Sequence, residues 1–157
     1  MRFKLPRGEA EAELLTCCAS RSWAAAMAAG RPYGSAGDLF AAADAAARAL
    51  EWPDVEEALN AHPRIGERPA GADRESAWSR GEQAGVGDAD RDALAEGNAV
   101  YKERFGYVFL ICASGRGSGE MLAELRERLA NAPDTERGVV HGELVKITNL
   151  RVRKLFA

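Results

Sequence analysis

Apolar side chains recur at helical spacing along the last part of the chain. Val140, Leu144, Ile147 and Leu155 fall on one face of a helix, because residues three or four positions apart lie above one another. This pattern predicts a final helix over 133–156, with a proline and an aspartate in its first turn, where both residue types are favoured.

Arg151 interrupts this apolar face. It follows Ile147 by four residues and therefore stands near the middle of the stripe. A charge on a buried stripe is costly unless it meets an anion or several acceptors. The commoner explanation is a structural salt bridge to a buried carboxylate, since buried charges are usually paired within the protein. The alternative is that Arg151 binds an anionic ligand, and the helix pattern alone does not decide between the two.

Glycines, prolines and capping residues divide the rest of the chain into further helices. We expect them over 8–19, 21–29, 35–50, 53–60, 76–84 and 88–105, and another that carries Met121, Leu122, Leu125 and Leu129. Breaks are expected at 62–66, in the polar loop 67–74 and in the glycine-rich turn 114–119. Residues 107–113 predict an extended, buried connector. The fold class predicted is all-α, a single compact domain of about eight helices over 1–157.

Composition supports this fold class. A chain of 157 residues can enclose one core. Much of its 46% apolar content is alanine, which favours helix. The net charge of −3 and the lack of a basic block disfavour nucleic acid as a partner. The small basic patch of Arg151, Arg153 and Lys154 instead complements the negative C-terminal end of the dipole of the final helix.

Targeting and cysteine signals point to the cytoplasm and away from a membrane. The first residues are charged and lack the apolar core of a signal peptide, and the longest apolar stretch, 107–113, is too short to cross a bilayer. Three cysteines, of which Cys17 and Cys18 are adjacent, form no disulfide framework and suit a reducing compartment. They have no metal-ligand spacing, and His62 and His141 are far apart in sequence, so a metal is disfavoured though not excluded.

His62 is the first candidate for chemistry. It precedes Pro63, which biases its backbone toward an extended conformation just after a helix. Imidazole titrates near neutral pH and can both donate and accept a proton during turnover. A loop histidine bonded to a carbonyl is the commoner role for such a residue, and one histidine is a weak signal by itself.

Ser79, Glu82 and Gln83 form a second candidate group. Their spacing places a hydroxyl, a carboxylate and an amide on one helical face. The alternative is a capping box with Ser79 as the N-cap. That reading is awkward because Gly85 would then end the helix after barely one turn.

The connector is the third candidate. An apolar segment outside helix and sheet leaves backbone N–H and C=O groups unpaired, and in 109–113 these groups are candidates to bind a ligand. Core filler or a buried strand is the commoner role for such a segment. Cys112 within it has no activating partner nearby in sequence, and a buried structural cysteine is the better interpretation.

Four motifs follow one another along the chain: His62-Pro63-x-Ile65-Gly66, Ser79-x-x-Glu82-Gln83, Asn98-x-x-Tyr101-x-x-x-Phe105-Gly106-Tyr107-x-Phe109-x-x-Cys112, and Lys146-Ile147-x-x-Leu150-Arg151. Taken together, they resemble the family of 2-oxo-4-hydroxy-4-carboxy-5-ureidoimidazoline (OHCU) decarboxylases, and the likeness covers nearly the whole chain. Trp23 and Arg31-Pro32 also fit. Val108 departs from the pattern, because the family often has proline there. The glycine-rich loop over 114–119 is particular to this sequence.

The resemblance implies an all-helical homodimer that uses no metal or organic cofactor and converts OHCU to S-allantoin in urate breakdown. It implies His62, Glu82 and Arg151 as catalytic residues, with His62 as the acid and base. Substrate would be held by Pro63, by Ser79, Arg80, Gly81, Glu82 and Gln83, by Phe109, Leu110, Ile111, Cys112 and Ala113, and by Arg151. Two other readings remain: a helical hydrolase or deaminase that activates water with His62 and Glu82, and a non-catalytic helical interaction domain.

Overall fold

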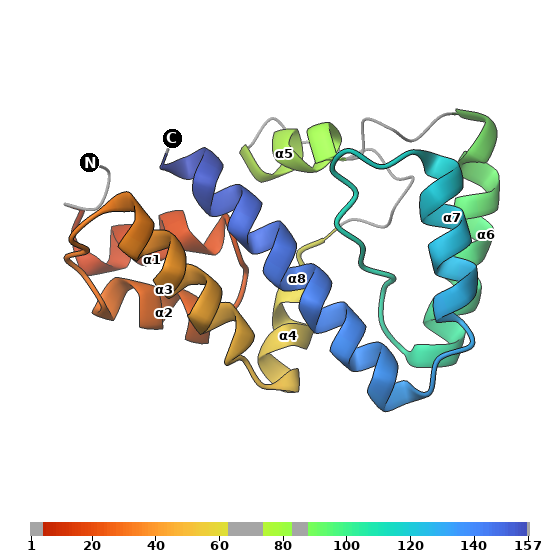
Figure 1. Ribbon diagram of the computed structural model, residues 1–157, viewed down its shortest axis with the longest axis horizontal. Helices are drawn as coiled ribbons and strands as arrows, with labels where there is room; N and C mark the ends of the chain where they lie inside the picture. Colours follow the sequence, from red (N-terminus) through yellow and green to blue (C-terminus); the bar gives the residue numbers. More distant parts are fainter. Residues whose placement is uncertain (1–4, 63–73, 83–87, 157) are drawn as a thin grey trace. The chain divides into compact units, whose positions relative to one another are not determined.

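The computed structural model describes residues 5–62, 74–82 and 88–156. These residues form eight helices and no strand, which confirms the all-α prediction. The helices are α1 (Arg7–Leu15), α2 (Arg21–Ala29), α3 (Ala36–Arg48), α4 (Trp52–Leu59), α5 (Arg74–Glu82), α6 (Asp88–Phe105), α7 (Ser118–Arg128) and α8 (Pro133–Leu155) (Figure 1).

The chain divides into two compact units. The terminal unit consists of Met1–Ala61 with Leu144–Ala157, and the central unit of His62–Glu143. Helix α8 supplies its first half to the central unit and its second half to the terminal unit.

Local signals in the sequence explain where the helices of the terminal unit begin. The Ser20 side chain accepts a 3.2 Å hydrogen bond from the N–H of Trp23 at the start of α2. Ser35 accepts one of 3.1 Å from the N–H of Asp38 at the start of α3, as the capping pattern predicts. A proline stands in the first turn of α4, where its missing N–H costs nothing.

The first helix is shorter than the apolar spacing indicates. It ends at Leu15 instead of continuing to residue 19. The Thr16 hydroxyl donates a 2.6 Å hydrogen bond to the carbonyl of Glu13, and the N–H groups of Cys17 and Cys18 both bond to the carbonyl of Leu14. These bonds close the last turn, and the helix ends here without a glycine or a proline.

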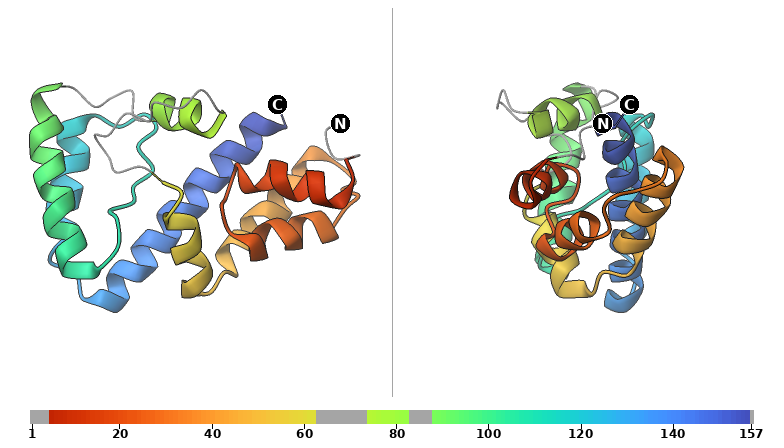
Figure 2. Two further views of the ribbon diagram at one scale, coloured as in Figure 1. Left: turned by 180° about the vertical axis from the view of Figure 1, so that it is seen from behind. Right: turned by 90° about the vertical axis from the view of Figure 1, so that its left-hand side faces the viewer.

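Trp23 lies at the centre of the terminal core. Its side chain is fully buried, and its Nε1–H donates a 3.1 Å hydrogen bond to the carbonyl of Ala43. This bond joins α2 to α3, and α2 packs against both α1 and α3 (Figure 2). Other apolar residues of this unit are also almost completely buried: Leu14, Met27, Leu39, Ala47, Val55 and Leu59.

The central unit is built on the contact of α6 with α7. Gly97 permits their close approach, because a Cβ at that position would stand only 3.0 Å from Leu125 Cδ2. Gly106, with φ of +85°, then ends α6 in the left-handed conformation that glycine tolerates best. The core of this unit contains Leu94, Tyr101, Phe109, Ile111, Ala113, Met121, Leu122 and Leu125.

None of the helices in the described parts of the chain is both long and apolar enough to cross a membrane.

Candidate active site

His62 follows α4 directly. The helix ends at Leu59, Asn60 forms its C-cap, and the N–H of Ala61 bonds back to the carbonyl of Ala58. His62 is half-buried in the bend that comes next. The predicted break after this helix is therefore confirmed at its first residue, whereas Pro63 and the rest of the motif lie outside the described residues.

Helix α5 carries the second predicted group. Ser79 is its sixth residue, so it is not an N-cap, and the capping-box interpretation is wrong. Glu82 follows Ser79 by three residues in the same helix. Arg80 and Gly81 are exposed and Glu82 is half-buried. Gln83 lies outside the described residues.

The connector between α6 and α7 is buried, as the sequence indicates. The exposed fractions of Phe109, Leu110, Ile111 and Ala113 are 1%, 3%, 2% and 4%. The segment belongs to no helix or strand. Cys112 departs from the prediction, because it is half-buried and not fully buried; it forms no disulfide with either of the other two cysteines.

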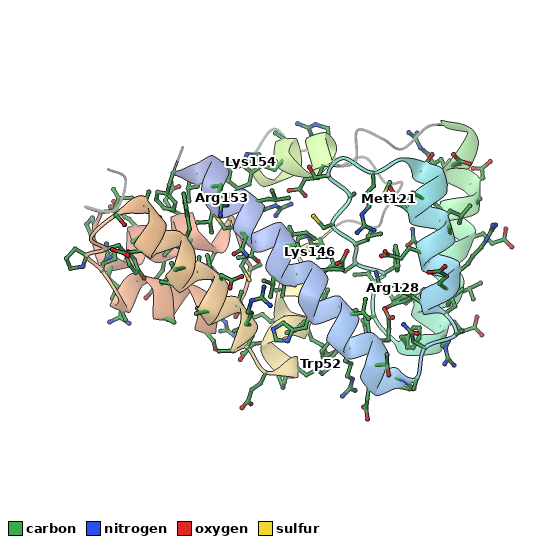
Figure 3. The ribbon with its side chains drawn as sticks, in the orientation of Figure 1. Trp52, Met121, Arg128, Lys146, Arg153 and Lys154 are labelled. Carbon is green, nitrogen blue, oxygen red and sulfur yellow. The ribbon has the colours of Figure 1, made fainter. Side chains whose placement is uncertain are left out.

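A charged group from α7 lies against this connector. Arg128 Nη1 donates a 2.8 Å hydrogen bond to the carbonyl oxygen of Leu110, and its guanidinium carbon lies 4.4 Å from the centre of the Phe109 ring. Figure 3 shows Arg128 directed from α7 toward the connector. The Arg128 side chain is only 4% exposed.

Glu136, at the start of α8, is the counter-ion of Arg128. Its Oε2 accepts hydrogen bonds from Arg128 Nη2 and Nε at 2.6 and 2.9 Å, and its Oε1 accepts one of 3.0 Å from Asn131 Nδ2. Burial opposes the Arg128 charge, but the bonds to Glu136 outweigh it and raise the pKa of Arg128 above its ordinary value. The arginine therefore stays charged although it is buried.

Tyr101 completes the cluster. Its hydroxyl donates to Glu136 Oε2, and its ring meets that of Phe109 edge-on, with centres 5.2 Å apart. Burial raises the pKa of Tyr101 well above its ordinary value, and the hydrogen bond to Glu136 adds to this effect. The tyrosine is thus a neutral hydrogen-bond donor across the physiological pH range.

A second carboxylate holds the connector two residues further on. Glu143 Oε1 accepts a 3.1 Å hydrogen bond from the N–H of Cys112 and lies 3.8 Å from Arg116 Nη2. Arg116 Nη1 in turn contacts Glu124 at 2.8 Å, and Glu124 lies 3.3 Å from Arg128 Nη1. Alternating charges from Glu136 to Glu143 therefore form one network beside the connector.

Sequence reasoning missed this network as a functional feature. Arg128 follows Met121 and Leu125 on a buried helical stripe, in the way that Arg151 follows Ile147. The same signal that singled out Arg151 is therefore present at Arg128.

Arg151 is buried on α8, with 5% of its surface exposed, among the buried apolar residues that predicted its stripe. Its charge acts on Cys18 in the terminal unit. Burial raises the pKa of the Cys18 thiol, and the Ser20 backbone, the Thr148 hydroxyl and the Arg151 charge only partly oppose this. Cys18 therefore remains a protonated thiol next to the arginine.

The predicted residues are divided between the two units. His62, Glu82 and the connector belong to the central unit, and Arg151 belongs to the terminal unit. Within the described ranges, no three histidine, cysteine, aspartate or glutamate side chains are grouped in a way that would hold a metal ion.

A groove of about 440 Å³ opens between α3 and α8 of the terminal unit. Asn149 Nδ2 donates a 2.8 Å hydrogen bond to Asp44 within it. The guanidinium carbon of Arg153, a residue labelled in Figure 3, lies 4.8 Å from the centre of the Phe40 ring. None of the residues that line this groove is one of the predicted site residues.

Comparison with known proteins identifies the family. The model of the OHCU decarboxylase family matches residues 4–153. The uric acid degradation bifunctional protein TTL of Arabidopsis thaliana is 37% identical over 153 residues, which are 94% of this chain and 47% of that protein. The 2-oxo-4-hydroxy-4-carboxy-5-ureidoimidazoline decarboxylase of Amia calva is 37% identical over 137 residues, 84% of this chain and 78% of that protein.

Solved structures agree with these relatives. A crystal structure of OHCU decarboxylase in the presence of (S)-allantoin superposes with a TM-score of 0.79 at 35% identity, over 92% of this chain and 96% of that one. The chain spans just under half the length of the Arabidopsis bifunctional protein. By sequence and by fold, the chain belongs to the OHCU decarboxylase family.

Proposed function

We propose that this protein decarboxylates OHCU to S-allantoin, a step of urate degradation, and that it needs no cofactor. The observation that carries the proposal is the family match over residues 4–153. It is strengthened by the likeness in fold to a decarboxylase crystallised with (S)-allantoin.

The chemistry of the substrate explains why a cofactor is unnecessary. In OHCU the carboxylate is attached to a carbon next to a C=N bond. As the bond to CO₂ breaks, its electron pair moves toward that C=N group, and the ring accepts the charge. Protonation of the ring nitrogen that received the charge, loss of the hydroxyl proton and protonation of the neighbouring carbon then give S-allantoin, with one proton taken up for each CO₂ released. The enzyme has only to orient the substrate, stabilise charge and control these proton transfers.

We assign these tasks to the residues that the family pattern points to. His62 would move the hydroxyl proton and the proton delivered to carbon, because imidazole titrates near neutral pH. Glu82 would hold the ureido N–H groups or orient His62. Arg151 would bind a substrate oxygen or the carboxylate, a role that suits a guanidinium on an otherwise apolar stripe.

The remaining contacts would come from backbone and polar groups. Ser79, Arg80, Gly81 and Gln83 would contribute from α5 and the residue after it, and Pro63 would shape the pocket next to His62. The buried connector over 109–113 would supply N–H and C=O groups, which are fixed in space by their neighbours and so need little ordering when substrate binds.

We further propose that the protein is a homodimer of the cytoplasm and that the chain acts as one domain. The three cysteines form no disulfide with one another, and Cys17 and Cys18 are fully buried, which is consistent with a reducing compartment. The homodimer rests on the family resemblance. Sedimentation of the purified protein, compared with the 16.8 kDa of one chain, tests it directly.

The test of the activity is an assay with freshly generated OHCU. CO₂ release together with the optical signal of S-allantoin is the expected result. Release of ammonia instead would indicate the hydrolase or deaminase alternative. Absence of any turnover by folded protein would favour the non-catalytic interaction domain.

A further inference from the structure

The connector over 109–113 is held by side chains at alternate positions. The Leu110 carbonyl accepts from Arg128 and the Cys112 N–H donates to Glu143. The two backbone groups that α7 and α8 hold, one on each side of Ile111 in the sequence, define the occupied edge of the connector.

The backbone groups of Ile111, the residue between them, define the other edge. Ile111 is 2% exposed, and its N–H and C=O form no hydrogen bond with any other residue that the structure describes. Unpaired buried backbone groups are costly, so this edge is suited to a polar ligand. Ureido and carbonyl groups of the substrate have the complementary donors and acceptors.

The side chains that bond to the occupied edge form a rigid group, because they are also bonded to one another. Arg128 is fixed by two hydrogen bonds, from its Nε and its Nη2, which form a fork on Glu136. Glu136 is fixed in turn by hydrogen bonds from Asn131 and Tyr101. Glu143 is linked to Arg128 through Arg116 and Glu124. A movement of either Arg128 or Glu143 would break several charge-assisted bonds at once.

We propose that Arg128 and Glu143 are positioning residues for the substrate, which fix the backbone of 109–113 so that the edge at Ile111 faces the ligand. Neither residue touches the reacting atoms. This inference rests on the proposed function, because it requires the connector to bind substrate.

The first test replaces Glu143 and measures the dissociation constant of S-allantoin together with kcat and KM. Glu143→Ala leaves the Cys112 N–H without its acceptor and should weaken S-allantoin binding and raise KM about tenfold, the equivalent of one lost hydrogen bond. The pH profile of kcat should stay unchanged, because the proton-transfer residue is intact. Glu143→Gln keeps an acceptor oxygen and should restore most of the affinity.

Two further variants keep the test decisive if Glu143→Ala fails to fold. Glu143→Asp keeps the charge near Arg116 but withdraws the oxygen from Cys112, and it should weaken binding as Glu143→Ala does. Arg128→Lys keeps a cation next to Glu136 but loses the fork and the bond to Leu110, with the same expected result. Glu127→Ala, an exposed acid on α7, is the matched control and should bind like the parent.

The outcomes separate this inference from the proposed function. If the parent protein neither turns over OHCU nor binds S-allantoin, the proposed function fails and the inference falls with it. If the parent is active but the folded Glu143 and Arg128 variants bind S-allantoin within twofold of it, only the positioning role is overturned. A lower melting temperature with unchanged affinity is likewise the result of a purely structural role and contradicts the inference.

Discussion

The carboxylate of Glu57, on α4, accepts two hydrogen bonds from Arg21, the first residue of α2. One comes from the backbone N–H at 2.9 Å and the other from Nε at 2.6 Å. The Arg21 side chain is 86% exposed, so its ion pair contributes little in water. The backbone bond matters more, because it satisfies an N–H at a helix start, where a negative charge is also favoured.

Removing this carboxylate should destabilise the protein. Glu57→Ala is expected to lower the free energy of unfolding at pH 7 by about 1 kcal/mol, the usual size of a lost helix cap. Urea unfolding followed by circular dichroism measures this difference. Glu56→Ala, an exposed neighbour in the same helix, is the control and should change the free energy of unfolding much less.

The effect of Glu57 should depend on pH. The backbone bond from Arg21, followed by its side-chain bond, lowers the pKa of Glu57 in the folded protein. A lowered folded pKa gives stability that is present above the unfolded value and is lost as pH falls through the folded value. The difference in the free energy of unfolding between the parent and Glu57→Ala should therefore become smaller as the pH is lowered from neutral to about pH 3. A difference in the free energy of unfolding that does not change with pH would show that the stabilisation does not come from the charge of the Glu57 carboxylate.

Helix positions could be predicted where a side chain marks the boundary. The sequence predicts α2 at both ends, since Ser20 caps its start and Gly30 its end. The end of α1 could not be placed, because its closing bonds come from a threonine hydroxyl and two cysteine N–H groups. No residue type in that segment is a strong breaker of helices.

The buried charges illustrate a different limit. Glu136 and Glu143 lie four residues before and three residues after Val140, on the stripe that drew attention to Arg151, and both are buried. Helical spacing is thus sufficient to place these acids in the core. It cannot name their partners, because Arg128 and the backbone of the connector reach them only when separate helices have packed.

Activity should be independent of metal ions. The substrate supplies its own electron sink, so the proposed reaction requires no Lewis acid to accept the electron pair left by CO₂. Dialysis against a strong chelator should leave kcat and KM within error of the untreated protein. Loss of activity that one added metal ion restores would contradict the cofactor-free mechanism, though not the assignment of the substrate.

His62 should be essential for proton transfer and much less important for binding. Its replacement by Gln keeps approximate size and some hydrogen bonding but removes the titrating group. General acid–base catalysis contributes roughly 10²–10⁴-fold, so the single-turnover rate should fall by at least that range. The affinity for S-allantoin should change only a few-fold. His141→Gln, at the other histidine, is the control, and a His62→Gln rate close to the parent would exclude His62 as the proton-transfer residue.

Arg151 should matter for both binding and turnover, unlike His62. Arg151→Ala removes a buried guanidinium, and the loss of its charge-assisted bonds to substrate should cost about 1.5–3 kcal/mol, or roughly 10- to 150-fold in S-allantoin affinity and in kcat/KM. Arg153→Ala, two residues further along α8 and exposed, removes the same charge and should leave both quantities nearly unchanged. Arg151 also lies next to Cys18 in the terminal core, so thermal unfolding must be measured in parallel. A variant that unfolds at lower temperature but binds S-allantoin like the parent would assign Arg151 to the core alone, as the salt-bridge explanation of its position requires.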